Sequence, residues 1–215
     1  MIDAFADRTE AGRLLARKVL ALKLANPVVV ALPRGGVPVA FEVARALHAP
    51  LDLLIVRKIG APGNPELAVA AVVEGPEVAI DRETLGMTGA TDAYVERRAK
   101  DELREIARRR VAYLRGRPAL SVKGKTAVLV DDGIATGTSV RAALRALRRK
   151  GAARLVLAIP VAPPDVVATL RGEVDELVCL SQPSHFFAVG THYLDFHQVG
   201  DDEVIQIMER ALGED

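Results

Sequence analysis

The chain has 215 residues, of which 50% are hydrophobic and 27% are charged, with a formal net charge of +1. This length can bury a substantial core, and the balanced charge gives no field that favours nucleic acid or a membrane surface. The single cysteine, Cys179, lies in an apolar run where we expect a buried core thiol, and it excludes an intramolecular disulfide. The sequence has no signal pattern and no membrane-length apolar run, which predicts a soluble, cytoplasmic protein.

The first part of the chain alternates between helical and strand patterns. Turn residues separate the apolar runs, and the helical stretches keep the spacing of a single buried face. In chain order we expect a helix capped by Thr9, a strand over Val28–Leu32, a helix from Pro38 to about His48, a second apolar run over Leu51–Val56, a Gly/Pro-rich loop over Ile59–Glu66, and a strand near Val78.

The same alternation continues to the end of the chain. Apolar strands that alternate with amphipathic helices predict βαβ units and a parallel sheet, and therefore an α/β protein. The expected elements are a long helix over 92–115, a strand ending at Val130, a helix from about Ser139, a strand over Arg154–Ile159, a short helix over Pro164–Leu170, a last core strand over Val174–Leu180, and a loop-rich tail with a final helix.

The long helix over 92–115 carries many arginines interleaved with acidic residues. This pattern favours a solvated face with ion pairs one turn apart. A nucleic-acid surface is the alternative, but only 4% of the chain is aromatic, which leaves little for base stacking. One apolar stripe is expected to face the core, formed by Ala99, Leu103, Ile106, Ala107, Val111 and Leu114.

The most informative stretch follows the apolar residues 127–130. Two adjacent carboxylates, Asp131 and Asp132, stand there before a turn rich in Gly, Thr and Ser. Such a turn can bring several backbone N–H groups to one point, and the helix that follows adds its positive dipole end, so an anion is expected. The carboxylates beside it are suited to sugar hydroxyls or a metal. The stretch therefore predicts a sugar-phosphate site.

Two other phosphate-binding patterns do not fit. No Lys stands before Thr138 or Ser139, as a Walker loop requires, and no G-x-G-x-x-G opens a helix after a strand. The order of strand, acid pair, spacer and Thr-Gly-Thr instead resembles the PRPP-binding motif of the type I phosphoribosyltransferases. The resemblance implies one domain over 1–215, with a three-layer parallel-sheet α/β core over about 25–182 and a small C-terminal hood with a helix over about 183–215.

The resemblance also implies roles for the residues of the motif. Asp131 and Asp132 would bind the ribose 2′- and 3′-hydroxyls, directly or through Mg²⁺, a cation that prefers oxygen ligands. The turn and the start of the helix would hold the 5-phosphate. The residues implied in that cradle are Ala135, Thr136, Gly137, Thr138 and Ser139.

Two further loops fit the resemblance, because ligands of parallel α/β sheets bind outside the carboxyl ends of the strands. In the first, Gly35 and Gly36 allow close backbone approach, Arg34 offers planar donors, and the resemblance places pyrophosphate there. In the second, Arg57 and Lys58 end a strand, and the basic residue Lys58 would lie near pyrophosphate ahead of a mobile loop that closes over the site. The plainer alternatives are a strand-to-helix turn with a surface Arg and a solvated strand end.

The tail segment Phe186–Phe196 resembles the hood of the hypoxanthine-type enzymes. Phe187 would then stack on a planar base, Val189 would offer it backbone polar groups, and Asp195 would lie near the base or metal. The alternative is a small hydrophobic cluster that anchors the C-terminal helix. Hypoxanthine-type enzymes carry an Asp where this chain has Ala135, as adenine-type enzymes do, so the acceptor base stays open.

Together these patterns predict a pentosyltransferase that transfers ribose 5-phosphate from Mg²⁺–PRPP to a nitrogenous base, a purine being favoured, and releases pyrophosphate. Arg34, Lys58, Asp131 and Asp132 would carry catalysis through positioning and electrostatic stabilisation. The alternative is a non-catalytic regulator that binds PRPP or a nucleotide. The sequence leaves open whether the chain forms a homo-oligomer.

Overall fold

The computed structural model describes residues 4–75 and 77–213, which form two sheets and the helices around them. The strands are β1 (Pro27–Ala31), β2 (Leu51–Leu53), β3 (Val56–Ala61), β4 (Asn64–Val73), β5 (Glu77–Ile80), β6 (Thr126–Val130), β7 (Arg154–Val161) and β8 (Glu176–Ser181). The helices are α1 (Arg8–Leu20), α2 (Gly36–Leu47), α3 (Arg82–Thr88), α4 (Asp92–Leu114), α5 (Thr138–Arg149), α6 (Pro164–Arg171), α7 (Asp201–Gly213) and the 3₁₀ helix η1 (Val189–His192).

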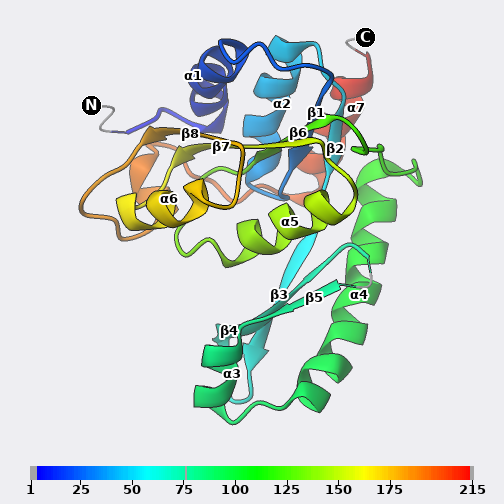
Figure 1. The fold of residues 1–215 in the computed structure, drawn as a ribbon. Coiled ribbons are helices and arrows are strands. Elements are labelled where there is room, and N and C mark those ends of the chain that lie inside the picture. The colour runs from blue at the N-terminus through cyan, green and yellow to red at the C-terminus, as the bar shows by residue number, and fades with distance from the viewer. Residues whose placement is uncertain (1–3, 76, 214–215) are drawn as a thin grey trace.

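A sheet of five parallel strands in the order β2-β1-β6-β7-β8 lies at the centre, and helices cover both of its faces (Figure 1). α1, α2 and α7 pack on one face, and α5 and α6 on the other. The strands β1, β6 and β7 are almost wholly buried, since neither face meets solvent. This is why they read as continuous apolar runs, and it confirms the predicted parallel-sheet α/β fold.

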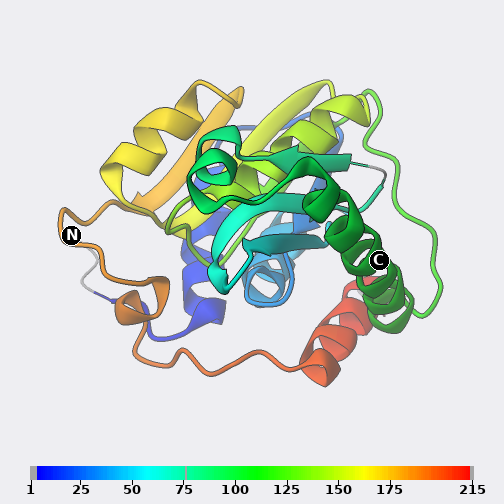
Figure 2. The same ribbon diagram turned by 90° about the horizontal axis from the view of Figure 1, so that it is seen from below.

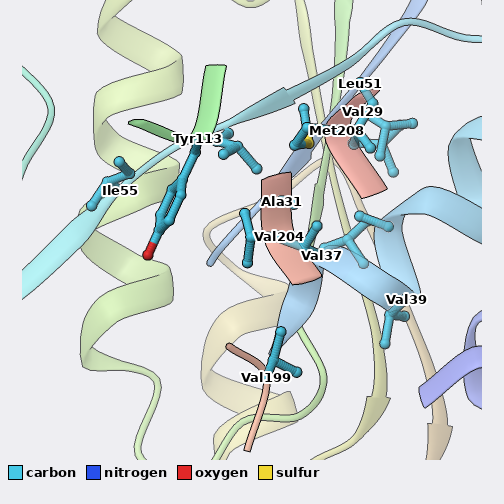
Figure 3. Close-up of a cluster of buried hydrophobic side chains, with 14 of the residues drawn as sticks. Val29, Ala31, Val37, Val39, Leu51, Ile55, Tyr113, Val199, Val204 and Met208 are labelled. Carbon is cyan, nitrogen blue, oxygen red and sulfur yellow. The ribbon is translucent and has the colours of Figure 1, made fainter. Parts of the chain in front are cut away.

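The core on the α2 and α7 face packs tightly around β1 (Figure 3). Val29 and Ala31 of β1 meet Val37 and Val39 of α2 and Val204 of α7 there, and all five side chains are buried. Burying a side chain of valine size stabilises the fold by about 1.5–3 kcal/mol. The packing therefore fixes the turn that joins β1 to α2 at the carboxyl end of the sheet.

The antiparallel strands β3, β4 and β5 form, with α3 and α4, a lobe that projects from the parallel sheet (Figure 1). The lobe begins inside the apolar run expected as one strand over Leu51–Val56. β2 ends at Leu53 within the parallel sheet, and β3 starts at Val56 within the antiparallel one. The expectation of a single strand is therefore wrong, because the chain changes sheets in the middle of this run.

The Gly/Pro-rich stretch over Ile59–Glu66, expected as a mobile loop, is the tip of a β-hairpin. Ile59 pairs with Ala70, and the ladder shifts register at Gly60 before the turn closes. Tyr94 on α4 donates a hydrogen bond from its hydroxyl to the carbonyl of Gly60 at 2.9 Å. The glycine and the prolines thus serve an irregular hairpin tip rather than an open loop.

The start of the described chain lies beside the segment around Tyr193 (Figure 2). The amide of Phe5 donates to the carbonyl of His192 over 2.9 Å, and the amide of Leu194 donates to the carbonyl of Phe5 over 2.8 Å. The rings of Phe5 and Tyr193 also meet, with centroids 5.3 Å apart. The start of the chain therefore holds residues 186–197, the C-terminal segment, in place. No local sequence pattern reveals this contact.

Three smaller expectations are also wrong. Asp7, not Thr9, caps α1, because the Asp7 side chain accepts a hydrogen bond from the amide of Glu10 at 2.7 Å. Cys179 is half-buried on the edge strand β8 rather than enclosed in the core, and burial raises the pKa of its thiol to about 11. On α4 the buried face is rotated from the expected apolar stripe, since Val111 is 62% exposed.

Among the described residues, none of the helices combines the length and the apolar character needed to cross a membrane.

Candidate active site

The site is built where β1 and β6 end side by side. Ala31 pairs with Val130 at the last rung of this parallel ladder, so the turn after β1 faces the acid pair after β6. Gly36 lies so close that a Cβ atom there would stand 2.9 Å from the Cα of Asp131. The glycine is therefore needed because the two turns approach each other closely.

The turn after the acid pair leads directly into α5. Gly137 adopts the left-handed conformation at φ 78° and caps the helix, and the first helical bond runs from the amide of Arg141 to its carbonyl. The amides at the start of the helix have no partner within it, and they lie at the positive end of the helix dipole. The turn thus has the geometry of an anion site.

A pocket of about 210 Å³ opens in front of this turn. It brings together residues from the hairpin, the acid pair, the turn with the start of α5, and the C-terminal segment. The lining residues are Lys58, Asp131, Gly133, Ile134, Ala135, Thr136, Gly137, Thr138, Ser139, Val140 and Val189. Every residue expected to cradle the 5-phosphate therefore lines one pocket, together with one member of the acid pair and the expected basic residue.

Lys58 reaches the pocket because side chains alternate along β3. Its neighbour Arg57 points to the other side of the strand, where its Nε lies 2.8 Å from the Oε2 of Glu102 on α4. Glu102 is buried, and Arg57 is its closest cation. Of the two basic residues that the sequence places together, only Lys58 is available to a ligand in the pocket.

The two aspartates have different surroundings. Asp131 lines the pocket, and burial together with the adjacent carboxylate of Asp132 raises its pKa well above the ordinary range. The carboxylate of Asp132 turns to the other side, where its Oδ2 lies 2.8 Å from the Nε of Arg8 at the start of α1. Burial raises the pKa of Asp132 as well, and the charge of Arg8 opposes that rise. Arg8 was not foreseen from the sequence, because it lies 124 positions from its partner.

Arg34, in the turn after β1, contacts α7. Its Nη1 lies 3.4 Å from the Oδ1 of Asp201, and the same oxygen accepts a hydrogen bond from the hydroxyl of Tyr113 at 2.7 Å. Both Arg34 and Asp201 remain partly exposed, so the ion pair is weak and exchangeable. Arg34 lies at the carboxyl-end edge of the sheet, and it is not among the residues that line the pocket.

Of the three tail residues singled out in the sequence, only Val189 reaches the pocket. A Cβ atom at Gly133 would lie 2.6 Å from the Cγ1 of Val189, so the glycine makes room for this side chain. Phe187 is 89% exposed, and Asp195 is exposed with its Oδ1 accepting a hydrogen bond from the amide of His197. The structure therefore does not bring Phe187 or Asp195 to the pocket lining.

The donor set of the site suits a hard cation that is held together with a ligand. Within the described part of the chain, no group of three or more His, Cys, Asp or Glu side chains is placed to hold a metal alone. Mg²⁺ is commonly bound by one or two carboxylates plus waters and substrate phosphates. Asp131 offers one such carboxylate in the pocket, and Asp132 lies next to it, so the residues fit Mg²⁺ held mainly by waters and a phosphorylated ligand.

Comparison with known proteins identifies the family of the chain. Residues 3–195 match the family model described as the phosphoribosyl transferase domain. Two curated proteins of Mycobacterium tuberculosis strains, provisionally named phosphoribosyl transferases, are each 46% identical over 207 residues, which is 96% of this chain and 47% of theirs. The chain thus spans about half the length of these relatives.

Solved structures give the same result. The crystal structure of a Thermus thermophilus protein is 47% identical, with a TM-score of 0.83 over 96% of this chain and 98% of that one. A purine phosphoribosyltransferase from Pyrococcus horikoshii shares the fold, with a TM-score of 0.50 at 15% identity over 90% of this chain and 93% of its own. With the family match covering most of its residues, the chain belongs to the phosphoribosyl transferase family.

Proposed function

We propose that this chain transfers ribose 5-phosphate from PRPP to a nitrogenous base, a purine being favoured, with release of pyrophosphate and with Mg²⁺ as the cofactor. The observation that carries this proposal is the single pocket that joins Lys58 and Asp131 to the turn over 135–139. A phosphate cradle, a carboxylate for sugar hydroxyls and a cation for a leaving pyrophosphate then lie in one cavity.

The phosphate end of the ligand occupies the turn before α5. The amides at Thr138 and Ser139 and the hydroxyls of Thr136 and Thr138, which lie 3.4 Å apart, offer donors to phosphate oxygens. The helix dipole adds a favourable field for the negative charge. These contacts place the sugar so that its hydroxyls face the acid pair.

The acid pair binds the ribose hydroxyls, with Asp131 in the pocket and Asp132 next to it. When bound, Mg²⁺ would neutralise charge on the pyrophosphate, and the carboxylate oxygens of this pair would help to hold it. Burial and the neighbouring carboxylate raise the pKa of Asp131, so a cation or a hydroxyl donor that binds beside it favours the charged form of its carboxyl group. Ligand binding and ionisation of Asp131 are thus coupled.

Charge on the departing pyrophosphate is met by Lys58 and Arg34. Lys58 faces the pocket, and Arg34 can exchange its weak contact with Asp201 for a phosphate oxygen. The chain needs no covalent nucleophile, since orientation of the two reactants and stabilisation of the leaving group suffice for this transfer.

The test is release of pyrophosphate from PRPP with a panel of purine and pyrimidine bases, with and without Mg²⁺. The variant Asp131→Asn/Asp132→Asn is expected to lose measurable PRPP affinity by calorimetry. Asp101→Asn, an exposed site on α4, serves as the matched control and is expected to bind like the parent chain. Unchanged PRPP affinity in the double variant would contradict the role given to the acid pair.

A non-catalytic regulator that binds PRPP or a nucleotide is the second candidate. It is favoured by Ala135, which lines the pocket where the hypoxanthine-type enzymes resembled by the tail carry an acid. PRPP binding without pyrophosphate release for any base of the panel would select the regulator. Release with even one base selects the transferase.

A further inference from the structure

Arg8 is a cation enclosed between three parts of the molecule. Only 7% of its side chain is exposed, and its Nε donates to the Oδ2 of Asp132 at 2.8 Å. Its Nη1 donates to the carbonyl of His197, also at 2.8 Å. The guanidinium lies over the ring of Phe196, 3.9 Å from its centroid. One side chain thus joins α1, the acid pair and the C-terminal segment.

The backbone around Arg8 places it at this junction. Asp7 caps α1, so Arg8 is the first residue of the helix. The residues just before it pair with the C-terminal segment, where the amide of Asp195 donates to the carbonyl of Ala6 over 2.9 Å. Arg8 therefore follows directly after the stretch that holds the tail, and its guanidinium reaches from there to the acid pair.

Two other contacts of Asp132 hold its backbone and crowd its carboxylate. Its backbone carbonyl accepts a hydrogen bond from the hydroxyl of Tyr193, a further residue of the C-terminal segment. On another side the carboxylate abuts Gly35, where even a methyl group would overlap with it. A guanidinium donates in a fixed planar fork, so it defines the direction of the carboxylate as well as balancing its charge.

We propose that Arg8 is a positioning residue that orients Asp132 for the sugar and locks residues 193–197 beside the acid pair. The sugar part of this inference rests on the proposed function, whereas the lock is a property of the protein alone. The consequence is a link between two properties: ordering of the C-terminal segment depends on the guanidinium of Arg8, and binding of the sugar phosphate depends on its positive charge beside Asp132. Loss of Arg8 then weakens both, although it is not one of the residues that line the pocket.

The chemistry of arginine predicts which parts of this role lysine can replace. The ammonium group of lysine carries the charge that pairs with Asp132. It lacks the planar face that stacks on Phe196 and the second N–H group that reaches the carbonyl of His197. In Arg8→Lys we therefore expect PRPP affinity within about threefold of the parent chain, because the ion pair survives. The contacts through which Arg8 holds residues 193–197 are expected to be lost in this variant.

The experiment measures hydrogen exchange and PRPP affinity in Arg8→Met and Arg8→Lys. Arg17→Met, an exposed arginine on the same helix, is the control. We expect the amides of Leu194 and Asp195 to exchange at least about tenfold faster in both Arg8 variants, corresponding to about 1.4 kcal/mol, and to keep their protection in the control. PRPP affinity should fall by at least about tenfold in Arg8→Met only.

The outcomes separate the two proposals. Parent-like exchange at both amides, or parent-like PRPP affinity in Arg8→Met, overturns the role of Arg8. A parent chain that does not bind PRPP overturns the proposed function, while the exchange data still decide the lock. If Arg8→Met does not fold, Arg8→Lys decides alone: fast tail exchange with retained PRPP affinity supports the proposal, and loss of neither or of both contradicts it.

Discussion

Gly35 and Asp132 lie in such close contact that a Cβ atom at Gly35 would stand 2.0 Å from the Oδ2 of the aspartate. Gly35 has φ −59°, so its backbone would accept any residue, and only the lack of space demands glycine. Gly35→Ala is therefore expected to displace the Asp132 carboxylate without straining the backbone. A displacement near 1 Å at a reacting site costs on the order of a hundredfold in turnover.

The measurement is the rate of pyrophosphate release, with PRPP affinity determined in parallel. Gly86→Ala is the matched control, because nothing lies within 4 Å of the atom that the substitution adds. It should leave both quantities unchanged. Parent-like turnover in Gly35→Ala would show that the position of Asp132 does not matter to the reaction.

The adjacent residues Arg57 and Lys58 should give opposite phenotypes. Lys58 faces the pocket, so Lys58→Met is expected to lower turnover by at least about tenfold with an unchanged midpoint of urea denaturation. Arg57 pairs with buried Glu102, so Arg57→Met is expected to reduce the free energy of unfolding by about 1 kcal/mol, a value discounted for its partial exposure. Turnover and urea denaturation, measured on both variants, check this division. Equal effects of the two substitutions on both measurements would contradict it.

The sequence predicts the parts of the fold and site that depend on local chemistry. Buried parallel strands appear as apolar runs, and the turn after Asp132 shows its glycines and hydroxyls within a few residues. The run over Leu51–Val56 misleads, because periodicity cannot show that one apolar stretch serves two sheets. Chain order alone does not show which side of β3 faces the pocket, and the expectation that Lys58 lies near the ligand came from the family resemblance.

Contacts between distant residues account for the rest. In the sequence, Arg8 and Tyr113 are ordinary helix residues. The fold sets Arg8 against Asp132, and the packing of α7 brings Asp201 to the hydroxyl of Tyr113. The buried face of α4 differs from the expected apolar stripe for the same reason. Glu102 lies on that face, where it pairs with Arg57 of β3. Such pairs cannot be predicted from the sequence, because the partners lie far apart in the chain and no periodic pattern relates them.

Tyr113 gives the fold a predictable response to alkaline pH. Burial, and then its hydrogen bond to Asp201, raise the pKa of its hydroxyl from 10.0 to about 12. The folded state therefore keeps this proton after the unfolded state has lost it, and stability falls as pH rises from about 10 to about 12. The contribution is fully present below pH 10. Tyr113→Phe lacks it, so we expect this variant to be less stable at pH 8 and the difference to shrink by pH 11.5. Urea denaturation of both proteins at several pH values measures this difference, and a constant gap would contradict the assignment.

Phe187 tests whether the tail meets the acceptor base. Its ring is 89% exposed, so Phe187→Ala should leave the thermal midpoint unchanged, as surface substitutions away from special contacts usually do. An aromatic ring that stacks on a planar base contributes about 1–3 kcal/mol, which corresponds to a loss of base affinity of at least about fivefold. PRPP affinity should stay the same, because the sugar-phosphate cradle lies on the other elements. Leu194→Ala, 81% exposed on the same segment, is the control and should change neither affinity. Equal losses for base and PRPP, or none, would mean that the ring does not stack on the base and that another part of the chain recognises the acceptor.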